Sequence, residues 1–277
     1  MSATTTTSRT GAAAPRQADR FSLSRTANLA RWNAVLLGRN RLALLYGTVL
    51  PLTPLLLLLT GDRGDQTVGV GAIGSVLLMA GLFPVFYNVL SQFVSRRDEL
   101  VLKRLRTGEV RDPELLAGIA LPGIAAALLV CVVVVPLAVA MGQPLPLNAV
   151  LFAVGALLAA AMFAGLAYWT AAWTRSAEAA QLTSMPVIIL AVAGPATMSI
   201  PTLPDPVREV ISRTPGAAMG ELVRVGWFGF DGVGATEATL TFAQTWGAAA
   251  GPLAVMVAWT VVAFSLASRS MRWEPRS

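Results

Sequence analysis

The chain has 277 residues, of which 55% are hydrophobic and 13% charged, about half the charged fraction of a soluble domain. Its formal net charge is +6, but the arginines lie beside apolar runs of roughly 20 residues, the length that a helix needs to cross a membrane. The composition excludes an ordinary soluble domain. It also argues against nucleic-acid binding, because arginines that flank apolar spans are a topology signal rather than a basic patch.

The N-terminal part of the chain divides into two segments. Residues 1–20 are rich in Thr, Ala and Arg and carry no apolar stripe, which predicts a disordered cytoplasmic tail. Over residues 21–41, apolar side chains recur at helical spacing, and Trp32 is placed to lie at the level of the lipid headgroups. This pattern predicts an interfacial helix that lies on membrane lipid; an ordinary cytoplasmic helix is the alternative.

Residues 42–268 contain six apolar runs, which predict an all-α integral membrane domain with six transmembrane helices. Pro51 and Pro54 in the first run are tolerated, because neighbouring helices can satisfy the freed carbonyls. Positive charge concentrates before the first run, after the second and on a cytoplasmic tail, 269–277, so both termini are predicted to be cytoplasmic. The predicted spans are Leu42–Thr60, Val68–Val94, Leu115–Met141, Leu147–Trp173, Leu182–Ile200 and Trp246–Ser268.

The connection between the second and third spans carries charges of both signs at helical spacing. Val101, Leu102 and Leu105 form a short apolar stripe among them, and Gly108 is a natural stop. The pattern predicts a short amphipathic helix over residues 97–106, which could lie along the membrane or dock on a soluble partner. A solvated, positively charged loop is the alternative.

The connection between the fifth and sixth spans is broken by several prolines. Two stretches in it, Asp205–Ser212 and Gly216–Val225, have the pattern of short helices, and neither is long enough to span a membrane. We therefore predict two re-entrant or outer-surface helices over residues 205–226. A plain extracellular loop is the alternative.

Several kinds of chemistry are excluded by composition. Histidine is absent and Cys131 is the only cysteine, so the chain has no intramolecular disulfide, no thiolate or imidazole metal site and no histidine for acid–base catalysis. Lys103 is the only lysine, and no GxxxxGK[ST] sequence surrounds it. The chain therefore cannot bind ATP through a P-loop of its own.

Taken in order, these features resemble the permeases of type-2 ABC transporters, a family of bacterial drug, lipid and polysaccharide exporters. The family's coupling-helix pattern is E-R-E-x-G-x-L-x-R-L-R-x-T-P, and residues 97–108 read RDELVLKRLRTG at that place. Leu100 stands where the family often has Gly, and Gly108 stands for the usual Pro. The family's Leu-Pro, short helix, Asn-Pro, short helix passage is matched by Leu203-Pro204 and Thr214-Pro215.

The resemblance implies a non-catalytic permease subunit of an ATP-binding cassette exporter in a bacterial plasma membrane. ATP and Mg²⁺ would be held by a separate ATPase subunit, with no cofactor in this chain, and a second permease, identical or not, would complete the pathway. The spans lack the aromatic strip typical of polysaccharide exporters, which favours a small amphiphile, a drug or a lipid-like cargo. Ion-coupled secondary transporters and integral-membrane enzymes are the alternatives, but both call for ionisable residues that the apolar runs almost lack.

The resemblance also implies two sets of functional residues. The residues expected to couple to the ATPase are Asp98, Glu99, Leu102, Arg104 and Leu105. The residues expected to line the pathway, in the second and fifth spans, are Phe83, Phe86, Tyr87, Asn88, Met185, Ile189 and Met198. For each of the latter, ordinary packing within the bundle is the alternative.

Overall fold

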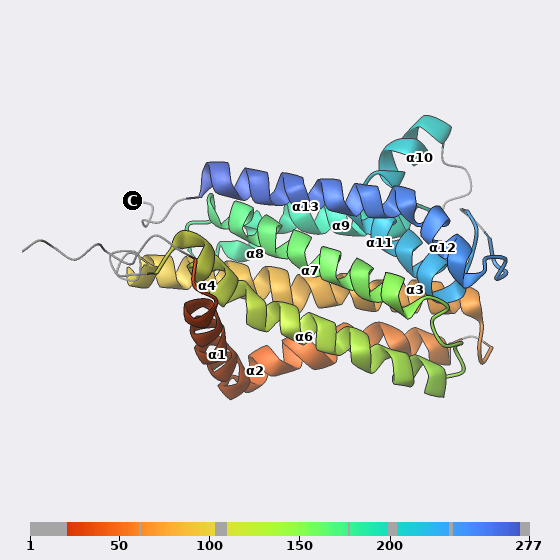
Figure 1. Ribbon diagram of the computed structural model, residues 1–277, viewed down its shortest axis with the longest axis horizontal. Coiled ribbons are helices and arrows are strands. Elements are labelled where there is room, and N and C mark those ends of the chain that lie inside the picture. The colour runs from red at the N-terminus through yellow and green to blue at the C-terminus, as the bar shows by residue number, and fades with distance from the viewer. Residues whose placement is uncertain are drawn as a thin grey trace, which may run out of the picture.

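The computed structural model describes residues 21–60, 62–102, 110–176, 178–198, 204–232 and 235–271. Helices make up its regular structure, and one isolated β-bridge joins Phe230 and Ala238. The long helices run side by side in one bundle, and α1 crosses one end of it (Figure 1). The long helical stretches are α2 (Arg41–Leu44) with η1 (Leu45–Val49) and η2 (Leu50–Leu59), α3 (Gln66–Gly81) with η3 (Leu82–Tyr87) and α4 (Asn88–Asp98), α6 (Asp112–Ala140), α7 (Ala149–Ala171) and α13 (Ala250–Ser270). The shorter ones are α1 (Leu23–Arg39), α8 (Ala180–Thr183), α9 (Met185–Met198), α10 (Asp205–Ser212), α11 (Pro215–Val223), η4 (Arg224–Phe228) and α12 (Phe242–Ala248).

Five of the described helical stretches are apolar and long enough to cross a membrane: Arg41–Leu59, Gln66–Asp98, Asp112–Ala140, Ala149–Ala171 and Ala250–Ser270. They coincide with the predicted first, second, third, fourth and sixth spans. The predicted fifth span coincides with α8 and α9, which together extend about 28 Å at 1.5 Å per residue. That length is close to the roughly 30 Å of a hydrocarbon core. The chain is an all-α integral membrane protein.

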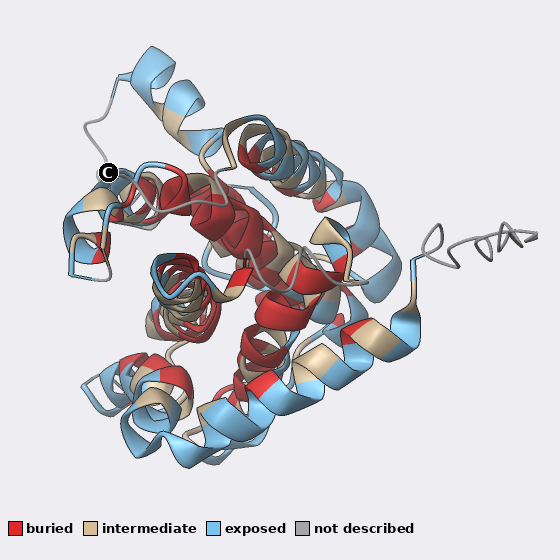
Figure 2. Ribbon diagram, turned by 90° about the vertical axis from the view of Figure 1, so that its left-hand side faces the viewer, coloured by how far each residue is buried: buried red, intermediate tan, exposed pale blue. Residues whose placement is uncertain are grey.

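Helix α7 lies at the core of the bundle. In its most apolar stretch, 61% of the residues are buried, whereas the corresponding share in α13 is 17%. Figure 2 shows the buried residues gathered in the middle of the bundle and the exposed residues on its outer faces. Small residues let α7 and α13 approach closely, because a Cβ at Gly165 would lie only 2.9 Å from the Ala263 Cβ. Such close contacts drive helix association where both the helix surfaces and the surrounding lipid are apolar.

Prolines change the winding of the first two spans. Proline has no N–H, so Pro51 and Pro84 cannot donate to the carbonyls of Gly47 and Ala80 four residues earlier. The chain forms the π-helical segments η1 and η3 around these positions and a 3₁₀ helix in η2. The two π-helical segments face one another, because a Cβ at Gly47 would lie 3.6 Å from the Pro84 Cβ. Such π-helical turns are frequent at functional sites.

Helix α1 lies against the start of α6, where the chain enters its third span. Asn33 donates from Nδ2 to the Gly118 carbonyl at 2.6 Å, and a Cβ at Gly118 would lie 2.7 Å from the Leu29 Cβ. Beside this packed face, Trp32 and Leu36 are 67% and 59% exposed, and Val35 on the far side of the helix is 41% exposed. The helix therefore has one face packed on the bundle and an exposed face that carries apolar side chains.

Helices α10, α11 and α12 lie at the end of the bundle opposite α1 (Figure 1). The predicted helix Asp205–Ser212 is α10, which protrudes and buries none of its residues. The second predicted helix begins at Pro215 as α11 and continues as η4. It packs into the bundle, because Gly194 of α9 lies directly against the backbone of Ala217.

Candidate functional site

An open cavity of about 780 Å³ lies between α1, the first span, the second span and the α8–α9 segment. Its apolar wall includes Tyr46 in η1, Phe83 and Pro84 in η3, and Met185 at the start of α9. The two π-helical segments therefore both border this space. Its polar wall is formed by side chains of α1, the α1–α2 junction, α4 and α8: Asn33, Asn40, Asn88, Ser91, Gln92, Arg96 and Gln181.

Four residues predicted to line a pathway border this cavity: Phe83, Tyr87, Asn88 and Met185. They come from the second span and from the segment predicted as the fifth. The Tyr87 hydroxyl lies 3.2 Å from the Ser184 hydroxyl and connects the two elements by a hydrogen bond. The second and fifth predicted spans are thus neighbours at this wall.

The other three predicted pathway residues have different surroundings. Phe86 is fully buried and packs edge-to-face on Phe163 of α7, with 6.4 Å between ring centroids, so it contributes to the bundle core. Ile189 is 65% exposed on α9 and does not border the cavity. The backbone of Met198 ends α9, and its side chain lies outside the described part of the structure.

A chain of polar contacts runs along the cavity wall and joins α1 to α4. Arg96 donates from Nη2 to Asn33 Oδ1 at 2.5 Å and to Gln92 Oε1 at 3.2 Å, and Gln92 Nε2 donates to Asn88 Oδ1 at 2.7 Å. The Nδ2 atom of Asn88 is buried and has no hydrogen-bond partner among the described residues. We did not predict a role for α1 in this wall from the sequence, although Asn33 and Asn40 lie seven residues apart and therefore on one helical face.

The connection after the second span begins differently from the predicted helix over 97–106. Arg97 and Asp98 form the last turn of α4, Glu99 ends it, and Leu100 has a positive φ of 59°. The left-handed residue turns the chain, and Leu102 beyond it is fully buried. The predicted boundary at residue 97 was therefore wrong, because the second span continues as a helix to Asp98. Arg104 and Leu105 lie outside the described residues.

Arg97 fixes the start of this connection to the chain at the end of α7. Its side chain is fully buried, and its guanidinium donates to the carbonyls of Ala171 at 2.8 Å and Thr174 at 2.7 Å. Ala171 is the last residue of α7, whose C-terminal end carries partial negative charge, and Thr174 lies three residues beyond it. Asp98 Oδ1 lies 3.4 Å from Arg97 Nε and balances the buried cation.

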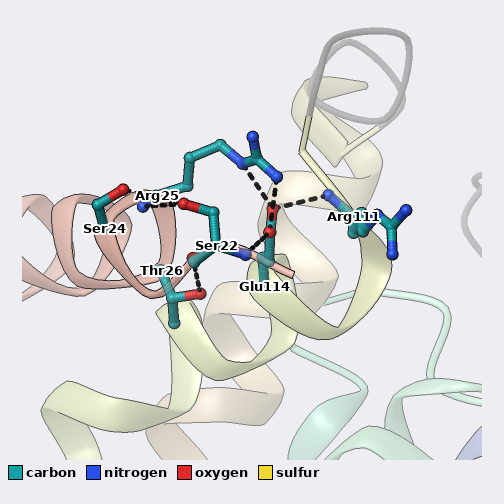
Figure 3. Close-up of polar contacts among 6 residues, drawn as sticks. All are labelled: Ser22, Ser24, Arg25, Thr26, Arg111 and Glu114. Atoms are coloured by element: carbon teal, nitrogen blue, oxygen red, sulfur yellow. Dashed lines mark hydrogen bonds and ion pairs between the residues drawn. The ribbon is translucent and has the colours of Figure 1, made fainter. Parts of the chain in front are cut away.

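Glu114 fixes the far end of the connection to α1, as Figure 3 shows. Its buried carboxylate accepts hydrogen bonds from the backbone N–H of Ser22 at 2.6 Å and from Arg25 Nε and Nη2 at 3.0 and 2.9 Å. It also accepts from the backbone N–H of Arg111 at 3.1 Å, in a capping box at the start of α6. The connection between the second and third spans is thus held at both ends by a buried charged side chain.

The backbone at Leu100 predicts a clear order of substitution effects. A positive φ costs an L-residue roughly 1–2 kcal/mol, glycine adopts it freely, and β-branched residues adopt it least. We therefore expect Leu100→Val to lower the free energy of unfolding by about 1 kcal/mol and Leu100→Gly to leave it the same or higher. Thermal unfolding can be followed with a thiol-reactive dye, because Cys131 is buried in the folded chain. If Leu100→Gly unfolded at a lower temperature than both Leu100→Val and the wild-type chain, that result would contradict the left-handed turn.

Comparisons with known proteins agree with this architecture. A family model described as ABC-2 family transporter protein matches residues 57–269, which include the second to sixth predicted spans in full and the connection between the second and third. A comparison with curated proteins gives no match. Since the family model covers more than half of the chain, the chain belongs to the ABC-2 transporter family and is a permease of the type-2 ABC transporters.

Proposed function

We propose that this chain is the permease subunit of an ATP-binding cassette exporter that moves a small amphiphile, a drug or a lipid-like cargo. The main support is the cavity of about 780 Å³ between the second span and the α8–α9 segment, which has an apolar wall and a polar wall. Such a space suits a molecule with one apolar and one polar end. Tyr46 and Met185 are exposed at its rim, so a second permease, identical or not, would complete the enclosure.

The energy for transport would come from a separate ATPase subunit that binds ATP and Mg²⁺. Asp98 and Glu99 are exposed where the second span ends, and Arg97 and Glu114 tie the two ends of the connection to α7 and α1. An ATPase that pushes on this connection would move the end of α7 through Arg97 and the start of α1 through Glu114. Because α1 forms part of the cavity wall, the push would reach the cargo site.

Docking of the ATPase can be tested by a double charge reversal, Glu99→Arg with Arg104→Glu. It preserves the net charge that sets topology, but it inverts local pairing at the proposed interface, where like-charge encounters cost several kcal/mol. We expect the ATPase recovered with the tagged permease in mild detergent to fall by at least about tenfold.

The matched control for docking is Glu209→Arg with Arg213→Glu, an exposed ion pair on α10 at the opposite end of the bundle. It should leave ATPase recovery unchanged, and ATP hydrolysis should be found only in fractions that contain the ATPase. Normal assembly and export with the 99/104 reversal would show that the connection is a solvated loop.

The orientation of the chain gives a second test. Arginine asymmetry predicts that both termini and the connection after the second span are cytoplasmic. In a Cys131→Ala background, cysteines introduced near residues 63 and 232 should react with a membrane-impermeant maleimide on intact cells, and cysteines near residues 103 and 273 should react only after permeabilisation. Labelling of residue 103 on intact cells would invert the topology.

A further inference from the structure

The cavity has a single kind of charge on its wall. Among the described residues that border it, Arg96 alone is charged and none is acidic. Arg96 forms no ion pair within the described part of the chain; its hydrogen bonds go to the side-chain oxygens of Asn33 and Gln92. Glu99 is the acidic side chain whose charge acts on it, and it does not form an ion pair with Arg96. A partly desolvated guanidinium that lacks such a pair favours an anion beside it.

The guanidinium of Arg96 also has N–H groups that donate to no described residue. Both of its hydrogen bonds to described residues leave from Nη2, which keeps the head of the side chain in place. An arginine has five N–H donors in a planar fork, so Nε and Nη1 remain for another acceptor. An oxygen of a phosphate, sulfate or carboxylate can accept a hydrogen bond from either of these donors, and such charge-assisted bonds are stronger than neutral ones.

The cavity leads from this cation toward apolar side chains deeper in the spans. Arg96 and Phe83 lie 13 positions apart in one helical stretch, which corresponds to about 20 Å along the helix axis. Tyr46, Pro84 and Met185 border the same space. The arrangement therefore places one cationic group toward the membrane surface and an apolar slot extending into the bilayer.

We propose that this cavity selects amphiphiles with an anionic head group, which Arg96 binds while the apolar tail lies along η1 and η3. The proposal rests on the proposed function and narrows its cargo class. A cationic amphiphile would meet Arg96 as a like charge, and a neutral one would leave the guanidinium without a counter-ion. The shared recognition chemistry is an anionic oxygen group on an apolar chain.

Photo-crosslinking with three probes tests this. The probes carry one diazirine-containing dodecyl tail and end in phosphate, phosphocholine or trimethylammonium, and the permease is held in nanodiscs of zwitterionic lipid. We expect the phosphate probe to label peptides from residues 33–47 and 81–98 at concentrations at least about tenfold lower than the trimethylammonium probe needs. Millimolar inorganic phosphate should not displace it, because the tail supplies part of the affinity.

Three variants assign the selectivity to Arg96. Arg96→Gln should weaken labelling by the phosphate probe about tenfold and remove its advantage over the trimethylammonium probe. Arg31→Gln removes the same charge from an exposed position of α1 that does not border the cavity, and it should change nothing. Asn40→Asp adds a carboxylate to the cavity wall and keeps the cap on Ala43 N, so it should lower the phosphate preference without loss of folding.

The outcomes separate this proposal from the proposed function. Equal labelling by the phosphate and trimethylammonium probes, or unchanged selectivity in Arg96→Gln, would each overturn anionic selection, even if an ATPase co-purifies and export proceeds. Displacement by inorganic phosphate alone would overturn the selection of an amphiphile, because the apolar tail would then add no affinity. Arg96-dependent selection of the phosphate probe supports the proposal. If that selection occurs but no ATPase assembles and no probe is exported, the anion site is supported and the proposed exporter function is contradicted.

Discussion

Arg97→Met is expected to lower the free energy of unfolding by about 3 kcal/mol, the largest loss from any single arginine on this connection. The substitution keeps much of the side-chain volume but removes two charge-assisted hydrogen bonds, to the carbonyls of Ala171 and Thr174. The Ala171 carbonyl stands at the end of α7 and the Thr174 carbonyl just beyond it, so α7 itself offers neither of them a donor. Arg97→Lys should recover part of the loss, because an ammonium keeps the charge but lacks the planar fork.

The measurement is thermal unfolding in detergent, followed through the reaction of buried Cys131 with a thiol-reactive dye. A loss of about 3 kcal/mol corresponds to a fall of roughly 5 to 10 °C in the unfolding temperature. Arg175→Met is the matched control, because Arg175 is exposed just beyond α7 and its removal should change stability by no more than about 0.5 kcal/mol. Equal unfolding temperatures for the two variants would show that Arg97 is not an anchor.

The sequence predicts those parts of the molecule that depend on local composition. Apolar runs indicate the spans because a helix must satisfy its own backbone within lipid, and the prolines around Asp205 indicate the start of α10. Pro51 and Pro54 of the first span were expected to be tolerated. The winding of the first two spans into π and 3₁₀ turns was not predicted, because it depends on the neighbouring helices as well as on the missing N–H groups.

Contacts between distant segments could not be predicted from one sequence. As a sequence feature, Arg97 is one of several cations on a cytoplasmic connection and is expected to be solvated. Its burial depends on α7 ending beside it, more than 70 residues later in the chain. Asn33 is similar, because its contacts with Arg96 and Gly118 require α1 to cross the end of the bundle. Leu100 differs from the glycine of the family pattern, but that difference does not indicate a left-handed turn until the backbone is known.

Glu114→Ala is expected to release the start of α1 from the bundle. The substitution removes the acceptor of four hydrogen bonds, two of them from the guanidinium of Arg25 and one from the backbone N–H of Ser22, which precedes the first turn of α1. Further along α1, Asn33 still binds the Gly118 carbonyl and Arg96, so the effect should be local opening rather than global unfolding. Local opening exposes a helix to proteases in proportion to the population of the open form.

Trypsin provides the measurement for this release, because α1 carries the exposed arginines Arg31 and Arg39, which trypsin cleaves only when the helix opens. A local loss of about 2–3 kcal/mol corresponds to a rise of roughly 30- to 150-fold in the rate of cleavage at these sites. Glu114→Gln keeps one acceptor oxygen and should give a smaller rise, and Glu178→Ala, at an exposed position beyond α7, should give none. If Glu114→Ala is cleaved no faster than the wild-type chain, the carboxylate does not hold α1. The route from the connection to the cavity wall would then have to run through Arg97 and Arg96 instead.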